Sequence, residues 1–441
     1  MSDDHIWGVL TSQSDEDALK QHITSTTDDY HGAVASREIH WLHPASGAWL
    51  AKEPDNTWHG WDSKAAAREV SADDWTPWQQ VLDRSAAPYY KWFTGGQTNA
   101  CFNLVDRHLL LGRAEKTAII FEGDRWDPSK NNGRGGPVTE QHISYRNLFQ
   151  EVILRMQVFK DLGLTKGDRI AFNLPNIPEQ VFYMLAAQRM GVVYTPVFGG
   201  FSAKTLSDRI HDAGAKLVIT ADGGYRNAEV VAYKGTYTDP ALDNYIPREA
   251  ALRTLKAVLA TYNLGDVADT LYADVSEALG GEITLERSDV MRELGASLVK
   301  QQSIAAELTA DLRTAVARQL ADAKHDVDNV IVVDYTGQEI VEHGRDRWSN
   351  DLVDSAKAKI ATQLGLASFD DLTQEDAEAL WSKLNAVLPV EGVDSNFPLF
   401  IIYTSGSTGK PKGVVHTHGS WLSGVSHTMR TVFNATPDDT L

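Results

Sequence analysis

The chain has 441 residues, with 60 Asp or Glu against 41 Lys or Arg, so its formal net charge at pH 7 is −19. This acidic balance argues against a general binder of nucleic acids or of anionic membranes, because both would repel it. Hydrophobic residues make up 42% of the chain, which at this length is enough for a sizeable core and two or three domains.

Cysteine usage and hydropathy bear on the compartment. The single cysteine, Cys101, excludes an intramolecular disulfide and fits a reducing environment, and nothing near it in the sequence marks it as activated. No apolar run reaches the ~18 residues that a membrane-spanning helix needs. The first ten residues lack the basic start and apolar centre of a signal peptide. We therefore expect a cytoplasmic protein with neither a membrane nor a nucleic acid as a partner.

Residues 1–73 form a polar N-terminal extension that is rich in tryptophan and shows little periodicity. We expect loops and short helices that wrap on a neighbouring domain. The tryptophans are candidates for a ligand cage or a partner surface, but simple core packing is the preferred interpretation.

From residue 74 the pattern changes to that of an α/β domain, which we place at residues 74–235. The expected strands cover residues 117–122, 169–174, 191–197 and 216–220, and the expected helices cover residues 144–162, 177–190 and 202–213. This alternation with short loops predicts a parallel sheet covered by helices on both faces. Such sheets bind ligands at the carboxyl ends of their strands.

Two of these strand ends carry glycines beside an aromatic or basic residue. Phe198, Gly199 and Gly200 follow one strand, and Arg226 lies in the loop after the next strand. Glycine allows a ligand to approach the backbone closely, and arginine can bind a phosphate with two hydrogen bonds. The alternative is a pair of ordinary turns with a surface arginine.

Residues 236–325 interrupt the α/β pattern with a helical insertion rich in Ala, Leu and charged residues. The expected amphipathic helices cover residues 248–259, 267–279 and 288–323. We interpret the insertion as helices that pack on themselves and on a partner or neighbouring domain. The α/β pattern resumes in residues 326–441, with a strand over 329–335 and a helix over 378–388 that Thr373 is expected to cap.

The most informative motif is TSGSTGKPKG at residues 404–413, which we call the phosphate loop. It lies between expected strands at residues 399–403 and 413–416. Its glycines let main-chain N–H groups surround an anion, its hydroxyl groups donate hydrogen bonds, and its lysines add positive charge. It is not a Walker A loop, because only two residues separate Gly406 from Gly409. A flexible linker is disfavoured, since strands flank the motif tightly.

This strand–loop–strand motif resembles the phosphate loop of the acyl-adenylate-forming enzymes, which include acyl-CoA synthetases, luciferases and the adenylation domains of peptide synthetases. The resemblance implies that the loop grips the ATP phosphates and stabilises departing pyrophosphate, with Lys412 and Thr404 in catalytic roles. The residues implied in phosphate binding are Thr404, Ser405, Gly406, Ser407, Thr408, Gly409, Lys410 and Lys412.

Residues 74–109 resemble the N-terminal cap of the acetyl-CoA synthetase group, through a W-F-x-G-G-x-x-N element and the D-R-H-L that follows it. In this group the counterparts of four residues lie at the CoA nucleotide, which implies a CoA site formed here by Phe198, Gly199, Gly200 and Arg226. The group frequently has a second arginine three positions after the first, where this chain has Glu229. His108 in the cap is interpreted as structural.

The resemblance implies the N-terminal part of an adenylate-forming large domain, an α/β fold of parallel sheets covered by helices. It also implies an AMP-forming ligase that joins a short-chain carboxylate to CoA, using ATP and Mg²⁺. In this family the metal-binding acid and the small C-terminal domain lie further along the chain than Leu441. We therefore expect no metal site in these residues and no activity from them alone.

The loops FGGFSA (residues 198–203) and ADGGYR (residues 221–226) are called the two glycine loops. Together with the Trp-rich extension and the insertion, they resemble the ligase part of the fused propionyl-CoA synthases. This resemblance implies 3-hydroxypropionate as the carboxylate. It also implies hydratase and NADPH-dependent reductase domains elsewhere in the polypeptide. The sequence leaves open whether the protein forms a homo-oligomer. The alternatives are a plain acetate or propionate ligase, and a non-catalytic interaction or gating module built on an adenylating fold.

Overall fold

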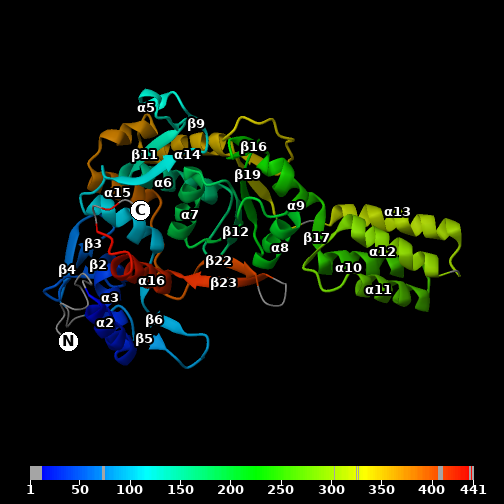
Figure 1. Cartoon of the computed structure of the whole chain (residues 1–441), viewed down its shortest axis with the longest axis horizontal. Coiled ribbons are helices and arrows are strands. Elements are labelled where there is room, and N and C mark those ends of the chain that lie inside the picture. The colour runs from blue at the N-terminus through cyan, green and yellow to red at the C-terminus, as the bar shows by residue number, and fades with distance from the viewer. Residues whose placement is uncertain are drawn as a thin grey trace.

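The computed structural model describes residues 12–71, 75–301, 303–323, 325, 327–405, 411–436 and 439 (Figure 1). Within these residues the central sheet has seven strands, in the order β20-β19-β14-β12-β13-β22-β23. Neighbouring strands run parallel except for β22 and β23, which form an antiparallel hairpin at one edge. The strands are β12 (Arg169–Asn173), β13 (Val193–Pro196), β14 (Leu217–Ala221), β19 (Asn329–Val333), β20 (Asp346–Trp348), β22 (Pro398–Ser405) and β23 (Pro411–Thr417).

Helices cover both faces of this sheet, so the predicted α/β fold is confirmed. Alternate strand residues face opposite sides: Ile170 and Ile219 pack against α6, α7 and α14, whereas Ala171 and Val218 pack against α8 and α9. The covering helices are α6 (Tyr145–Asp161), α7 (Pro178–Met190), α8 (Ala203–Ala213), α9 (Asp239–Asp243), α14 (Ser349–Leu364) and α15 (Ala377–Val387).

Side-chain caps fix where several of these helices begin. Ser202 accepts a hydrogen bond from the N–H of Thr205 and caps α8, as the sequence predicts. The prediction for α15 is wrong, because Asp376 caps this helix by accepting the N–H of Ala379. Thr373 lies instead in a separate short 3₁₀ helix (Phe369–Gln374), which the sequence pattern did not predict.

The N-terminal region is more ordered than the sequence pattern indicates. After α2 (Gln13–Ser25) and α3 (Thr27–Glu38), the described residues form an antiparallel sheet of six short strands, ordered β21-β7-β1-β2-β3-β4. Trp41, Trp49 and Trp58 are almost fully buried in its core, which agrees with packing rather than a ligand cage. The strands are β1 (Trp41–His43), β2 (Ala48–Lys52), β3 (Trp58–Trp61), β4 (Ala67–Val70), β7 (Gln97–Thr98) and β21 (Val393–Asp394).

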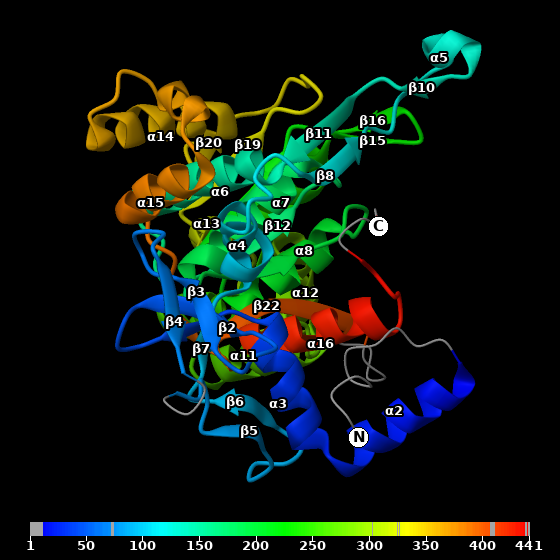
Figure 2. The same ribbon diagram turned by 90° about the vertical axis from the view of Figure 1, so that its left-hand side faces the viewer.

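The two ends of the described chain meet. Helix α3 lies beside α16 (His418–Thr431) in Figure 2, where the Tyr30 hydroxyl is 2.5 Å from His427 Nδ1 and Arg430 pairs with Glu38.

The remaining elements of the cap and the loops are β5 (Gln80–Asp83), β6 (Lys91–Thr94), a π-helical turn (Phe102–Asp106), α4 (Arg107–Leu110), β8 (Thr117–Glu122), β9 (Trp126–Asp127), α5 (Lys130–Gly133), β10 (Gly136–Pro137), β11 (Glu140–Ser144), β15 (Gly224–Arg226), β16 (Glu229–Val231) and a second π-helical turn (Lys234–Thr238).

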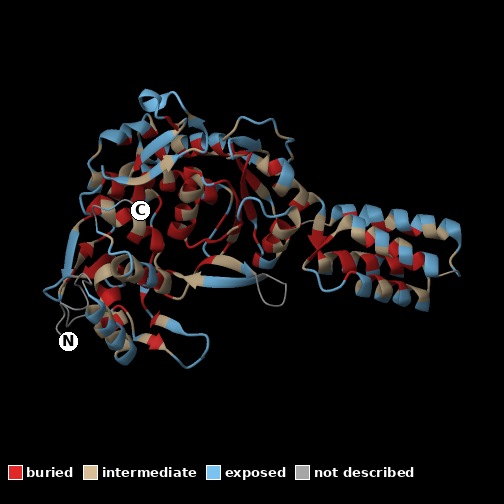
Figure 3. Cartoon of the chain, in the orientation of Figure 1, coloured by how far each residue is buried: buried red, intermediate tan, exposed pale blue. Residues whose placement is uncertain are grey.

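The insertion projects from one end of the molecule with a buried core of its own (Figures 1 and 3). The first helix of residues 236–325, α9, packs on the sheet, and the projecting part that follows has four helices among its described residues: α10 (Arg248–Ala260), α11 (Asp266–Ala278), α12 (Arg287–Lys300) and α13 (Ala306–Asp322). The single helix predicted over 288–323 is therefore wrong. Leu294 and Leu312 both enter the same core, which requires the chain to reverse direction between them.

A two-stranded ribbon joins the insertion to the main body. Strand β17 (Tyr245–Pro247) pairs with β18 (Thr284–Glu286). The Asp208 carboxylate on α8 accepts hydrogen bonds from the backbone N–H and the hydroxyl of Thr284, at 3.0 and 2.6 Å. Helix α8 is thus one point of attachment. None of the helices in the described part of the chain is both long and apolar enough to cross a membrane.

Candidate functional site

The predicted ligand loops lie at the carboxyl ends of the parallel strands of the central sheet. Strands β12, β13, β14, β19 and β22 are parallel, so their carboxyl ends reach the same edge. The loops that follow β13 and β14 contain the predicted CoA residues, and β22 leads into the phosphate loop. This edge is where an open α/β sheet binds its ligands.

The phosphate loop connects the two strands of the hairpin at the end of the sheet. Thr404 and Lys412 are cross-strand partners in the β22–β23 register, and both are exposed. Ser405 ends β22 opposite Pro411. The predicted residues Gly406, Ser407, Thr408, Gly409 and Lys410 lie outside the described residues.

The two glycine loops meet around Tyr233, a residue that the sequence did not single out. A Cβ atom on Gly199 would lie 2.0 Å from the Tyr233 hydroxyl, so any larger residue there would have to displace the Tyr233 side chain. A Cβ atom on Gly200 would lie 3.1 Å from Arg226 Nη1. Phe198, which is 66% exposed, projects beside them. The structure therefore brings all four predicted CoA residues together.

Arg226 is presented by a tight hairpin of β15 and β16. It pairs in register with Glu229, across a turn in which Asn227 and Ala228 both have positive φ. The Asp124 carboxylate accepts the N–H of Ala228 at 2.6 Å. Glu229, the residue at the place of a second arginine, is thus directly opposite Arg226, and it weakens the positive field that Arg226 offers to a phosphate.

A buried aspartate organises the neighbouring strand ends. The Asp222 carboxylate, after β14, accepts hydrogen bonds from the N–H groups of Gly223, Tyr335, Thr336 and Gln338 and from the Thr336 hydroxyl, at 2.6 to 3.1 Å. These bonds fix the loops after β14 and β19 relative to each other. Sequence reasoning passed over Asp222, because all of these partners except Gly223 lie more than a hundred residues further along the chain.

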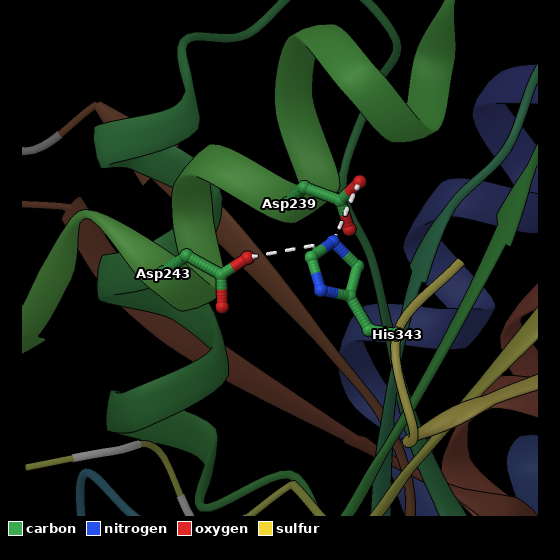
Figure 4. Close-up of side chains that lie close together, drawn as sticks. All are labelled: Asp239, Asp243 and His343. Carbon is green, nitrogen blue, oxygen red and sulfur yellow. Dashed lines mark ion pairs between the residues drawn. The ribbon is translucent and has the colours of Figure 1, made fainter. Parts of the chain in front are cut away.

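One cluster has the composition of a metal site. Asp239, Asp243 and His343 converge in Figure 4, with His343 Nε2 at 3.6 and 3.9 Å from the two carboxylates. However, Lys234 lies 2.8 Å from Asp239, and Arg345 lies 2.7 Å from Asp243. Burial acts to raise the pKa of Asp243, but the Arg345 guanidinium holds this pKa below its ordinary value. These protein cations already neutralise the carboxylates, so we assign the cluster a structural role.

The two reactive side chains of the cap are held in inert states. Burial, reinforced by the charge of Asp106, raises the pKa of the Cys101 thiol well above its ordinary value. Burial and the neighbouring Arg107 lower the pKa of His108 to about 3, and its ring packs on Tyr145. These environments agree with the structural interpretation of His108 and with a Cys101 that is not activated.

Comparisons with known proteins give matches over most of the chain. The sequence model described as AMP-binding enzyme matches residues 112–441, and the one described as acetyl-coenzyme A synthetase N-terminus matches residues 61–104. An acetyl-coenzyme A synthetase of Mycobacterium tuberculosis is 32% identical over 375 residues, which cover 84% of this chain and 40% of that protein. One from Streptomyces avermitilis is 30% identical over 421 residues, 95% of this chain and 42% of that protein. The chain thus spans well under half the length of these curated relatives.

Proposed function

Because the chain belongs to the family of AMP-binding enzymes, we propose that the protein carrying it is an AMP-forming ligase, which joins a short-chain carboxylate to CoA through an acyl-adenylate. The observation that carries the proposal is the family match over residues 112–441, which includes the phosphate loop. The names of the matched relatives, acetyl-coenzyme A synthetases, indicate the substrate class.

In the first step, a carboxylate oxygen attacks the α-phosphorus of ATP. An acyl–phosphate bond forms, the bond to the β-phosphate oxygen breaks, and pyrophosphate leaves. This chemistry needs alignment and stabilisation of the charge that builds on the leaving group. We assign that role to the phosphate loop, with Lys412 as its main charge and Thr404 as a hydroxyl donor opposite it in the hairpin. Mg²⁺ enters with the ATP phosphates, and we assign it no ligand in this chain.

In the second step, the CoA thiol gives up its proton to water and its sulfur attacks the acyl carbon. The bond from that carbon to the AMP phosphate oxygen breaks, so a thioester forms and AMP leaves. We assign the CoA nucleotide to the surface formed by Phe198, Gly199, Gly200 and Arg226. The open backbone at the two glycines and the exposed Phe198 ring suit a base or a phosphate close to the main chain. The cationic Arg226 suits a phosphate.

The proposed acid is 3-hydroxypropionate, as in the fused propionyl-CoA synthases. This choice rests on the resemblance of the Trp-rich extension, the insertion and the two glycine loops to the ligase part of those enzymes. The relatives' names favour acetate as the competing substrate. A non-catalytic gating module remains the alternative from another class, and it predicts nucleotide binding without turnover.

The test is carboxylate-dependent exchange of radiolabelled pyrophosphate into ATP, followed by thioester formation when CoA is added. The complete gene product would be assayed with acetate, propionate and 3-hydroxypropionate at equal concentrations. The proposal expects exchange that depends on the acid, with 3-hydroxypropionate giving the highest kcat/KM. Exchange that is fastest with acetate would replace the proposed acid but keep the ligase. ATP binding without exchange for any acid would support the gating module.

A further inference from the structure

Helix α8 carries two charged residues, three positions apart, that reach the same tyrosine of β22. The Tyr403 hydroxyl donates a 2.6 Å hydrogen bond to Asp212 Oδ2. The Arg209 guanidinium lies over the Tyr403 ring, 5.6 Å from its centroid. Residues three apart on a helix share a face, so α8 contacts both the ring and the hydroxyl of this side chain.

Arg209 is buried at an energetic cost that packing alone does not explain. Its side chain is only 7% exposed, and its Nε and Nη1 atoms have no hydrogen-bond partner among the described residues. Burial lowers the pKa of this guanidinium, against the opposing effects of Tyr403 and Asp208. A buried cation with unsatisfied donors is disfavoured unless another requirement maintains it, and such exceptions occur at functional sites.

The position of Arg209 indicates what that requirement is. Its guanidinium also lies over the ring of Phe201, 4.3 Å from the centroid. Phe201 directly follows the proposed CoA residues, and Tyr403 directly precedes Thr404 of the phosphate loop. One side chain therefore contacts an aromatic residue beside each of the two proposed ligand sites.

Helix α8 is a firm support for these contacts. Ser202 caps its first turn, and Gly214, in the left-handed conformation, ends it. Leu206 and Ile210 anchor the helix in the core beneath the sheet, and Asp208 holds the insertion through Thr284. The face that carries Arg209 and Asp212 is thus fixed relative to the sheet.

We propose that Arg209 and Asp212 are positioning residues, which hold Tyr403 and the strand entering the phosphate loop in the geometry that binds the ATP phosphates. This inference rests on the proposed ligase function. Transfer at phosphorus depends on alignment, and displacements of about 1 Å lower rates by ~10²-fold. Arg209 also contributes a positive charge beside the strand that leads to the polyphosphate.

The test compares ATP–pyrophosphate exchange by variants of the complete gene product. Tyr403→Phe removes the hydroxyl, Asp212→Asn removes its charged acceptor, and Arg209→Met removes the guanidinium but keeps an unbranched apolar chain. For each variant, kcat/KM for ATP is expected to fall about 10-fold, because the loop is displaced rather than lost. Arg209→Lys, which keeps the charge but not the planar group, is expected to recover part of this loss.

A matched control and an independent readout separate positioning from general destabilisation. His211→Gln lies on the same helix, beside Asp212 but facing Glu249 of the insertion, and is expected to leave exchange unchanged. In the positioning variants KM for the carboxylate should stay constant, and hydrogen exchange of residues 398–404 should be faster than in wild type.

Three outcomes would overturn the inference. The first is exchange in all three variants at the wild-type rate. The second is a loss of kcat/KM that is equal for ATP and for the carboxylate, together with a lower melting temperature. This result would show that Arg209 and Asp212 only stabilise the fold. The third, no exchange by folded wild type with any acid, removes the ligase function itself and the inference with it.

Discussion

The Asp106 carboxylate and the Arg189 guanidinium form an ion pair of 2.9 Å in which both side chains are completely buried. Arg189 also donates hydrogen bonds to Asn385 and to the carbonyl of Leu388, and Trp381 donates one to Asp106. The pair therefore joins the N-terminal cap, α7 and α15. It fixes the cap to the sheet on which both proposed ligand loops are built.

Breaking this pair should destabilise the fold strongly. Asp106→Asn leaves Arg189 charged and buried without its carboxylate, and such losses cost about 3–5 kcal/mol of unfolding free energy. Urea unfolding followed by tryptophan fluorescence measures the change. Asp28→Asn, in an exposed pair with Arg84, is the control and should change stability little. Equal effects of the two substitutions would contradict the role assigned to Asp106.

Stability should fall in acid partly because of His418. This buried ring accepts the N–H of Ala100 at Nδ1, at 3.0 Å, and burial lowers its pKa to about 3. Between the unfolded value near 6.5 and this folded value, only the unfolded chain binds the proton. The group therefore contributes stability that is lost as pH falls, by up to about 1.4 kcal/mol per pH unit.

The comparison that isolates this group is wild type against His418→Asn, since the Asn oxygen can still accept the N–H of Ala100. Urea unfolding at pH 7 and pH 5 should show a steeper loss of stability in wild type than in the variant. The other buried histidines are present in both proteins, so their contributions to the pH dependence of the unfolding free energy cancel. Identical pH dependences would show that His418 does not titrate in the way its environment predicts.

A methyl group on Gly199 should impair the CoA step selectively. In Gly199→Ala the new atom would displace the Tyr233 hydroxyl, which lies 2.0 Å from its position. We expect KM for CoA to rise about 10-fold, while ATP–pyrophosphate exchange, which needs no CoA, is unchanged. Gly344→Ala is the control, since nothing lies within 4 Å of its added Cβ. Adding Tyr233→Phe should restore part of the loss, whereas an equal loss in both half-reactions would remove the CoA assignment.

Loss of the Asp208 carboxylate should loosen the insertion without unfolding the sheet. Asp208→Ala removes the acceptor for both donors of Thr284 and for Lys204. Hydrogen exchange should become faster in β17 and β18 and remain unchanged in β12 and β14. Asp354→Ala, on the exposed face of α14, serves as the control. Protection unchanged at the ribbon would show that other contacts hold the insertion.

Sequence reasoning performed best where elements are long and periodic. The strands and helices that were predicted between residues 117 and 221 match the structure closely, because apolar spacing and caps such as Ser202 are local signals. The short elements between β8 and α6, β11 among them, were not predicted. It failed on the six-stranded N-terminal sheet, whose strands are too short to show alternation. It also joined α12 to α13, because both helices are amphipathic and only packing into a common core shows the reversal between them.

The candidate site was predictable in its loops but not in its supports. Glycines, lysines and the resemblance to a known motif identify the phosphate loop and the CoA residues as a hypothesis. The supports Arg209, Asp212 and Tyr233 carry no local signal, since their roles depend on long-range contacts. Tyr403 and Asp212, for example, are 191 positions apart.

The most direct test of the central claim is carboxylate-dependent ATP–pyrophosphate exchange by wild type, Lys412→Ala and Lys160→Ala in the complete gene product. Lys160 is an exposed lysine in the last turn of α6, which leads into the amino end of β12, whereas the phosphate loop follows the carboxyl end of β22. We predict exchange in wild type and Lys160→Ala, and a rate about 100-fold lower in Lys412→Ala, because charge on departing pyrophosphate loses its main counterpart. No exchange by folded wild type, or equal exchange in Lys412→Ala, would contradict the account.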